Sequence, residues 1–169
     1  MQIERAHPRD ATTLTNIAIE AKRHWGYSEK WMANWRDVLT IRSEQIETDE
    51  VYCATVVDEI LGFYALHRDH DVLRLEHLWV LPKIMRRGVG RALFEHSVEQ
   101  TRALGFRSLH IESDPNAEGF YQRMGARRVG MNMTQLDGQH RELPLLIYEV
   151  PQTPESIRPV LNSGMQPGQ

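Results

Sequence analysis

The feature that most constrains this chain is a basic turn with two glycines, placed between an apolar strand and a helix. Residues 80–93 read Val-Leu-Pro-Lys-Ile-Met-Arg-Arg-Gly-Val-Gly-Arg-Ala-Leu. Gly88 and Gly90 lack the Cβ atoms that keep a ligand away from the backbone, and the first N–H groups of a helix have no partner within it. The turn therefore predicts a phosphate site, although two glycines among solvated arginines would be weak evidence if they stood alone.

A second motif covers residues 111–126, which read Ile-Glu-Ser-Asp-Pro-Asn-Ala-Glu-Gly-Phe-Tyr-Gln-Arg-Met-Gly-Ala. It predicts a strand end, a turn and a short helix closed by glycine. In order and spacing, the two motifs together closely resemble the acetyl-CoA-binding core of the GCN5-related N-acetyltransferases, the GNAT superfamily. The resemblance covers residues 50–130 well and extends more loosely over residues 1–150.

The resemblance implies an α/β (mixed α+β) GNAT fold with a twisted, mostly antiparallel central sheet whose central strands splay apart. It implies about six to seven strands flanked by about four helices. The hydrophobic pattern is consistent with this order, including a strand–helix–strand crossover after a meander. It predicts strands at 3–7, 51–57, 60–67, 72–80, 107–112, 127–133 and 143–150, and helices from Asp10, from Ser28, at 88–104 and at 116–124.

Composition and segment character set limits on the domain organisation and on the partners. At 169 residues the chain suits one domain, which we place at 1–150, followed by a flexible tail at 151–169 that is rich in proline, glycine and polar residues. A net charge of −3 argues against a nucleic-acid partner. The opening residues contain no apolar signal region, and no segment is long and apolar enough for a membrane, so we expect a cytoplasmic protein without a membrane partner.

Two other features are interpreted as structural. Cys53 is the single cysteine and stands in an apolar run, which favours a buried thiol over a nucleophile. The segment 67–71, His-Arg-Asp-His-Asp, falls in a predicted hairpin turn without fixed ligand geometry, so we expect no metal.

The resemblance implies that acetyl-CoA is the cosubstrate and that its pantetheine arm inserts between the splayed strands. Transferred residue by residue, it assigns the pantetheine contacts to the backbone of Leu78, Trp79 and Val80. It assigns the pyrophosphate to Arg86, Arg87, Gly88, Val89, Gly90, Arg91 and Ala92. Met85 departs from the Gln or Arg that the family usually has there, and Arg86 can substitute in part. Asn116 is assigned to the cofactor arm, with a helix cap as the alternative, because many relatives place their asparagine three residues before the alanine.

Transfer to an amine requires deprotonation of an ammonium with an ordinary pKa of about 10.4 and protonation of a thiolate with an ordinary pKa of about 8.5. Tyr121 matches the family tyrosine whose hydroxyl lies near the CoA sulfur, so the resemblance implies that it is the acid; the alternative is a core aromatic beside Phe120. Glu76 and Glu112 are the two candidates for the general base, directly or through water. The alternative for each is a solvated charge at a strand end.

The predicted function is an acetyl-CoA-dependent N-acetyltransferase that moves an acetyl group to a primary amine of a small molecule or peptide, by direct transfer in a ternary complex. The alternative is a catalytically silent acyl-CoA-binding sensor or partner-binding module. Residues 24–27 with Trp31 and Trp35 lie where the family builds its acceptor wall, although their helical spacing is also typical of a core. The sequence does not identify the acceptor. A homodimer through exposed strands is one expected assembly.

Overall fold

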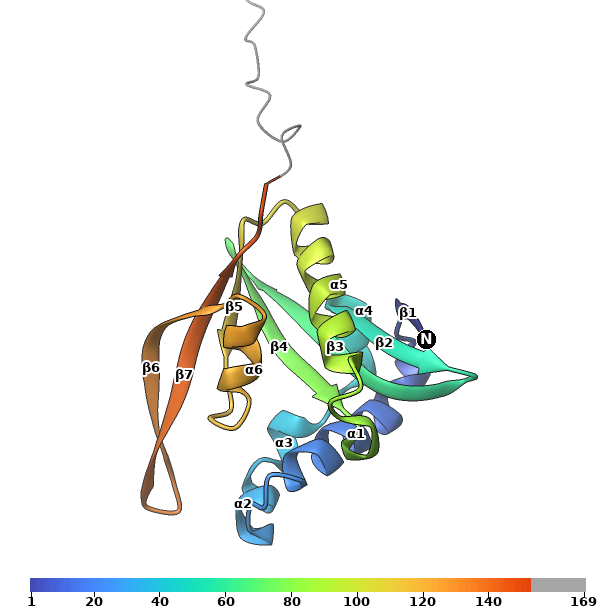
Figure 1. The fold of residues 1–169 in the computed structure, drawn as a ribbon. Helices are drawn as coiled ribbons and strands as arrows, with labels where there is room; N and C mark the ends of the chain where they lie inside the picture. The colour runs from blue at the N-terminus through green and yellow to red at the C-terminus, as the bar shows by residue number, and fades with distance from the viewer. Residues whose placement is uncertain (153–169) are drawn as a thin grey trace, which may run out of the picture.

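The structure is a computed structural model, and it describes residues 1–152. The expected tail therefore lies, apart from residues 151 and 152, outside the described residues. Seven strands form one sheet in the order β1-β2-β3-β4-β5-β7-β6 (Figure 1). The strands are β1 Gln2–Arg5, β2 Glu50–Val56, β3 Glu59–Asp69, β4 Val72–Val80, β5 Ser108–Glu112, β6 Arg127–Leu136 and β7 Gln139–Glu149. Neighbouring strands run antiparallel except for the pair β4–β5, which confirms the mixed, mostly antiparallel sheet.

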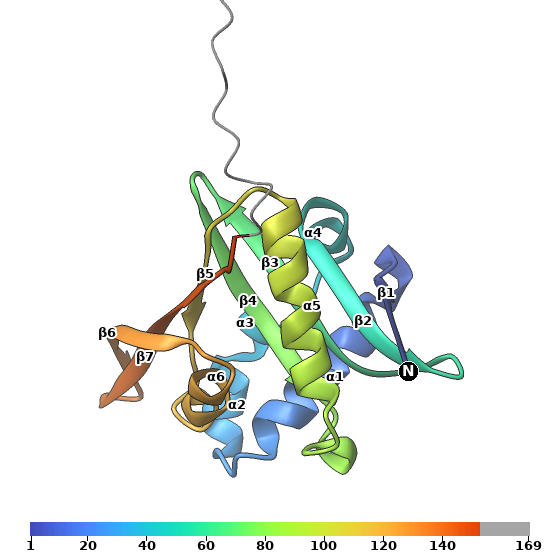
Figure 2. The ribbon, with the colours of Figure 1, turned by 45° about the horizontal axis from the view of Figure 1, so that its top comes forward.

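Helices cover both faces of this sheet, with α5 and α6 on one face and α1 to α4 on the other (Figures 1 and 2). The helices are α1 Ala11–Arg23, α2 Glu29–Asn34, α3 Arg36–Leu39, α4 Ser43–Thr48, α5 Val89–Ala103 and α6 Glu118–Arg123. Ser28 is the predicted N-cap of α2, and its hydroxyl accepts a hydrogen bond from the Trp31 amide at 3.2 Å. The helix expected from Ser28 is interrupted at Trp35, and the short α4 was not anticipated, so the described part has six α-helices.

The two faces of the sheet carry separate hydrophobic clusters because successive strand residues point to opposite sides. In β3, Tyr64 and Leu66 belong to the cluster under α5 and α6, whereas Phe63 and Ala65 belong to the cluster under α1 to α4. Cys53 is buried in the second cluster as a free thiol, as predicted. A sheet covered on both sides explains why these strands read as nearly continuous apolar runs.

The central strands β4 and β5 splay apart, as the family resemblance implied. They meet in register only at Arg74 and His110, while the other edge of β4 pairs with β3 and the other edge of β5 pairs with β7 along their lengths. The β3–β4 register shifts where Ala65 and Leu66 pair with His77 and Leu75, so Glu76 is the extra residue of a β-bulge in β4. Figure 1 shows the two strands diverging toward the lower part of the view. Beyond Arg74, the edge of β4 that faces β5 therefore has no neighbouring strand.

The last two strands form a longer hairpin than the apolar pattern predicted, with β6 reaching Leu136 and β7 beginning at Gln139. The expected turn at Asp137–Gly138 is confirmed, and both residues have positive φ, at 50° and 74°. The extra hairpin residues are mostly polar and partly exposed, so hydrophobicity gave no signal for them. No helix within residues 1–152 is long and apolar enough to cross a membrane.

Candidate functional site

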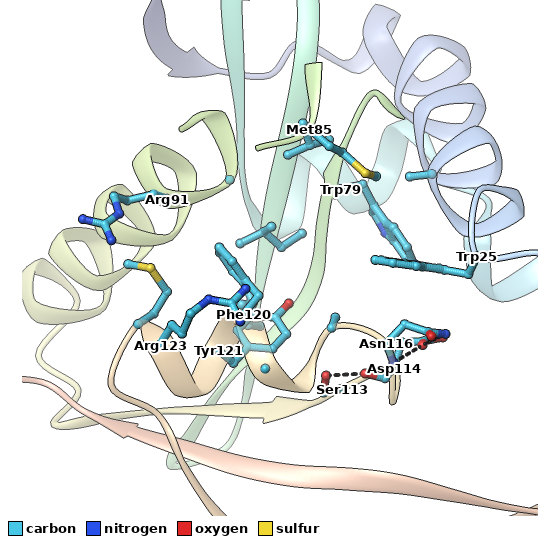
Figure 3. A pocket seen from close by; sticks show the side chains of 18 of the residues that line it. Trp25, Trp79, Met85, Arg91, Ser113, Asp114, Asn116, Phe120, Tyr121 and Arg123 are labelled. Carbon is cyan, nitrogen blue, oxygen red and sulfur yellow. Dashed lines mark hydrogen bonds between the residues drawn. The ribbon is translucent and has the colours of Figure 1, made fainter. Parts of the chain in front are cut away.

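A cavity of about 830 Å³ opens between the splayed strands β4 and β5 (Figure 3). Its wall comes from β4, the turn before α5, the end of β5, α6 and the end of α1. The predicted site residues on this wall are Glu76, Leu78, Trp79, Val80, Arg86, Gly88, Gly90, Arg91, Glu112, Asn116 and Tyr121. Three predicted residues do not line it: Arg87 is exposed, Val89 is buried in the core, and the Ala92 amide donates to the Gly88 carbonyl at 3.0 Å.

The basic turn owes its shape to the two glycines, which have different roles. Gly88 is the N-cap of α5 and has φ +85°, a conformation that L side chains rarely adopt. Gly90 has no such constraint: a Cβ added there would lie 3.6–3.7 Å from Phe120 and Val80, which is ordinary contact. Protein packing therefore does not require glycine at position 90. A free approach to the first amides of α5 is the remaining physical reason for it.

Three arginines surround this turn on the cavity wall: Arg86, Arg91 and Arg123. Arg123 lies at the end of α6 and was not anticipated. Its only sequence signal is a basic side chain two residues after Tyr121. Met85, which stands where the family usually has Gln or Arg, is partly buried against the core and also lines the cavity.

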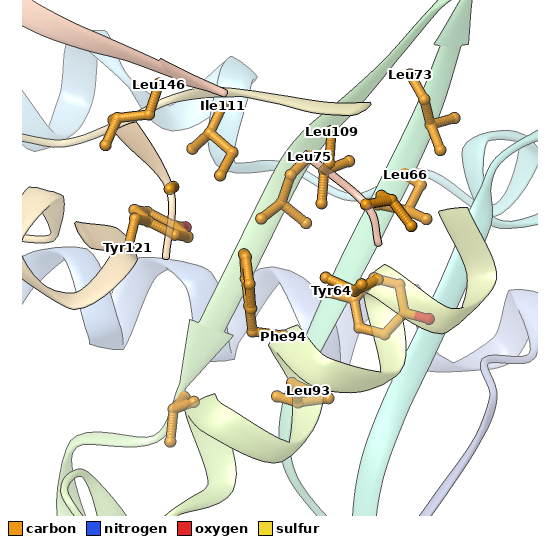
Figure 4. Packing of buried hydrophobic residues seen from close by; sticks show 14 of the residues in the cluster. Tyr64, Leu66, Leu73, Leu75, Leu93, Phe94, Leu109, Ile111, Tyr121 and Leu146 are labelled. Carbon is orange, nitrogen blue, oxygen red and sulfur yellow. The ribbon is translucent and has the colours of Figure 1, made fainter. Parts of the chain in front are cut away.

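Tyr121 lies under the cavity with its hydroxyl pointing into it (Figure 3). Tyr121 is 7% exposed, and its ring centroid lies 6.0 Å from that of Phe94, within the cluster that Figure 4 shows, and 5.2 Å from that of Phe120. Among the described residues the hydroxyl has no hydrogen-bond partner. Burial, with the nearby charge of Asp114, raises the pKa of Tyr121, so the phenol keeps its proton and can donate it. The ring of Tyr121 can therefore belong to the hydrophobic core while its hydroxyl faces the cavity.

Glu76 and Glu112 both reach the cavity from the two splayed strands. The Glu112 carboxylate accepts a hydrogen bond from the Asn132 side-chain amide at 2.9 Å, whereas Glu76 is exposed and has no bonded partner in the described chain. His77, the neighbour of Glu76 in sequence, is a partly buried and uncharged side chain. Burial lowers its pKa to about 4, and its Nδ1 atom lies 3.1 Å from the indole N–H of Trp79, so it is a neutral acceptor that orients Trp79.

Asp114 is the centre of a buried polar network at the end of the cavity where α1 ends. Its carboxylate accepts from Lys22 Nζ at 2.5 Å and from the Tyr27 hydroxyl at 2.9 Å. The side-chain amide of Asn116 donates to both Asp114, at 2.9 Å, and Tyr27, at 3.0 Å. The structure thus places the Asn116 amide in this network. Asp114, three residues before Ala117, stands where many relatives have their asparagine, and this spacing was the one signal that could have identified it.

The expected acceptor wall divides into two parts. His24 and Trp25 line the cavity. Tyr27, Trp31 and Trp35 instead pack together, with centroids 4.8–5.9 Å apart, and their faces hold two of the protein's own cations. Lys22 Nζ lies 4.2 Å from the Trp35 centroid, and the Arg141 guanidinium carbon lies 4.7 Å from it. No group of three or more potential metal ligands occurs in the described part.

Comparisons with known proteins identify the family of this chain. The family model described as "Acetyltransferase (GNAT) domain" matches residues 25–138, so the chain belongs to the GNAT acetyltransferase family. The peptidyl-lysine N-acetyltransferase YjaB of Salmonella typhimurium is 32% identical over 89 residues, which are 53% of this chain and 56% of that protein. The match therefore spans little more than half the length of this relative.

Solved structures share the fold. The PaiA N-acetyltransferase of Thermoplasma acidophilum, in complex with coenzyme A, has a TM-score of 0.69 at 18% identity and covers 88% of this chain and 98% of its own. The ribosomal-protein-S18-alanine N-acetyltransferase of Escherichia coli has a TM-score of 0.67 at 21% identity, covering 93% and 98%. The predicted GNAT fold is thus confirmed.

Proposed function

We propose that this protein is an acetyl-CoA-dependent N-acetyltransferase that acts on a primary amine by direct transfer in a ternary complex. The observation that carries the proposal is the cavity between β4 and β5, because it connects the basic turn of α5 with Tyr121 and with the glutamates of both strands. Family membership supports the same reaction class.

The residues present suit acetyl-CoA, which when bound supplies an acetyl group activated as a thioester. The first amides of α5, with Arg86, Arg91 and Arg123, form a cationic site for its phosphates. The unpaired edge of β4 at residues 78–80 offers backbone groups along the direction of the cavity. Glycine at position 90 keeps the approach to the helix amides open.

Proton transfers accompany the reaction. Glu76 or Glu112, directly or through water, takes the first proton from the acceptor ammonium, so that the amine nitrogen can form the new N–C bond. As the C–S bond breaks, the Tyr121 hydroxyl donates its proton to the departing sulfur, and the nitrogen releases its second proton, which restores the Tyr121 hydroxyl through water. The raised pKa of Tyr121 keeps the phenol protonated until the C–S bond breaks.

The wider setting of the reaction is also a proposal. The acceptor is a primary amine of a small molecule or a peptide, and the name of the curated relative refers to peptidyl-lysine. We place the protein in the cytoplasm because its cosubstrate is an intracellular metabolite. A homodimer is supported by the edge strand β6, where Val129 and Met133 are 46% and 58% exposed.

Titration calorimetry with acetyl-CoA, CoA and ATP tests the cofactor assignment. We expect acetyl-CoA and CoA to bind, and ATP to bind far more weakly because it has no pantetheine arm for the β4 edge. Absence of binding by both CoA forms would overturn the proposal. Binding without transfer to any amine would instead favour an acyl-CoA sensor.

A further inference from the structure

The charged side chains on the cavity wall are separated by sign. The guanidinium groups, Arg86, Arg91 and Arg123, border the part formed by the α5 turn and α6. The carboxylates, Glu76, Glu112 and Asp114, border the part formed by β4, β5 and the β5–α6 turn. In Figure 3, Arg91 lies at the left, Arg123 extends from α6 toward Phe120, and Asp114 lies at the right beside Asn116. Since the guanidinium end suits phosphates, the carboxylate end faces the acceptor.

The carboxylate end has more negative charge than the protein itself neutralises. Burial alone would raise the pKa of Asp114, but the Lys22 ammonium at 2.5 Å holds it below its ordinary value, and Arg141 adds a second cation at 4.0 Å, so the charge of Asp114 is fully neutralised within the protein. Glu112 is bonded only to the neutral Asn132 amide, and Glu76 has no partner among the described residues. Glu76 and Glu112 each lie two residues beyond the one registered pair of β4 and β5, and both line the cavity that opens between the two strands.

The aromatic group made by Tyr27, Trp31 and Trp35 is not the place where a substrate cation binds. Lys22 and Arg141 already occupy its faces, and neither of them lines the cavity. The indoles on the cavity wall are those of Trp25 and Trp79, which lie on the side of Figure 3 that holds Asp114. They offer flat apolar surface for a methylene chain, with carboxylates beside it.

These observations indicate an acceptor with two cationic groups. Only one glutamate is needed to take the proton of the reacting ammonium, so the second carboxylate keeps its charge throughout the reaction. A monoamine leaves that charge unpaired, and an amino acid adds a carboxylate to it. Along this end of the described wall no lysine or arginine is present to receive such a carboxylate.

We propose that the acceptor is an aliphatic diamine or polyamine, whose second ammonium binds the glutamate that does not act as base; this rests on the proposed function. One amine loses a proton to the first glutamate and forms the N–C bond. As the C–S bond breaks, the sulfur takes the Tyr121 proton, and the second proton released by the nitrogen restores the Tyr121 hydroxyl through water. The second ammonium stays charged between the carboxylate and the indoles, and so selects the substrate without taking part in the transfer.

The test uses three acceptors with the same four-carbon chain: 1,4-diaminobutane, n-butylamine and 4-aminobutyrate. Steady-state kcat/KM for each amine is measured with saturating acetyl-CoA. After division by two for its equivalent amines, the diamine should exceed butylamine by about tenfold or more, and 4-aminobutyrate by about 100-fold. Higher ionic strength should reduce both ratios, since the preference is electrostatic.

Glu76→Gln and Glu112→Gln separate binding from proton transfer. Loss of the base slows the diamine and butylamine alike, and so leaves their ratio unchanged. Loss of the carboxylate that holds the second ammonium should bring the ratio close to one. Glu47→Gln, on the exposed surface of α4 and away from the cavity, is the matched control and should change neither quantity.

Equal kcat/KM for diamine and butylamine, or a ratio that neither variant lowers, would overturn the acceptor class and leave the proposed function standing. If kcat/KM is higher for Nα-acetyl-lysine amide, which has one side-chain amine and two neutral amide groups, than for the diamine, the diamine proposal is overturned in favour of a peptide acceptor. Acetyl-CoA binding without transfer to any of these amines would contradict both the acceptor class and catalysis. Failure to bind acetyl-CoA would contradict the proposed function itself.

Discussion

Substitution of Gly90 by glutamate should change stability and cofactor affinity in opposite directions. Position 90 lies in the first turn of α5, its φ is not positive, and an added Cβ meets only ordinary contacts. Replacing a helical glycine gains about 0.5–1 kcal/mol, and an acidic side chain near a helix N-terminus gains about 0.3–1 kcal/mol. The free energy of unfolding should therefore rise by about 1 kcal/mol in the protein without ligand.

The same carboxylate would stand among the phosphates of the cofactor. At roughly 5 Å and an effective dielectric between about 20 and 80, each pair of unit charges repels by about 0.8–3 kcal/mol. A pyrophosphate with about two charges then costs at least about 1.6 kcal/mol, or at least about 15-fold in Kd. Gly90→Gln has nearly the same size and no charge, so the difference between the two variants isolates the electrostatic part.

Denaturant unfolding and calorimetric titration with CoA measure the two quantities separately. We expect Gly90→Glu to unfold at higher denaturant than wild type and to bind CoA much more weakly than Gly90→Gln does. Wild-type affinity in Gly90→Glu, or equal weakening in both variants, would refute the placement of phosphates at this turn.

Three further predictions concern the acid, the base and the buried network. Tyr121→Phe should lower kcat by about 100-fold while leaving the Kd for acetyl-CoA unchanged; an unchanged kcat would assign the tyrosine to structure alone. Of Glu76→Gln and Glu112→Gln, the one that removes the base should abolish the acidic limb of the pH–rate profile, and two unchanged profiles would point to water or another group. Lys22→Met should cost about 3 kcal/mol of unfolding free energy, because it removes the nearer cation from buried Asp114 and leaves the more distant Arg141, at 4.0 Å. A folded-state pKa below the ordinary value means that Asp114 stabilises the fold above about pH 4 and loses this effect as the pH falls; without Lys22 that pKa rises, so the midpoint of acid unfolding should move to higher pH. An unmoved midpoint in circular dichroism would show that the pair is not a source of stability.

Local sequence signals predicted those parts of the fold where a turn residue stands at the end of an apolar segment. Gly88 and Gly105 mark the two ends of α5, and Asp137–Gly138 marks the last hairpin turn. The splay of β4 and β5 has no local signal, since it depends on which strands pair beyond Arg74. It came from the family resemblance alone.

The missed features of the site arise from contacts between distant segments. Lys22 and Asp114 are 92 residues apart, and Arg141 joins them from β7. A lysine near the end of an amphipathic helix is normally exposed to solvent, so hydrophobic periodicity could not predict that Lys22 is buried against Tyr27 and Trp35. The same holds for the tryptophans: their four-residue spacing predicted one helix face, but not that the helix breaks at Trp35.

A product assay tests the central claim most directly. Purified protein and acetyl-CoA are incubated with one amine in each reaction: 1,4-diaminobutane, n-butylamine, 4-aminobutyrate or Nα-acetyl-lysine amide. Free CoA thiol and acetylated amine are then both quantified by mass spectrometry. Our account predicts that acetylated amine and free CoA form in equal amounts, and only when protein, acetyl-CoA and amine are all present. The Gly90→Glu variant should form much less of both products. Acetylamine at the level of the protein-free reaction for every acceptor would contradict it.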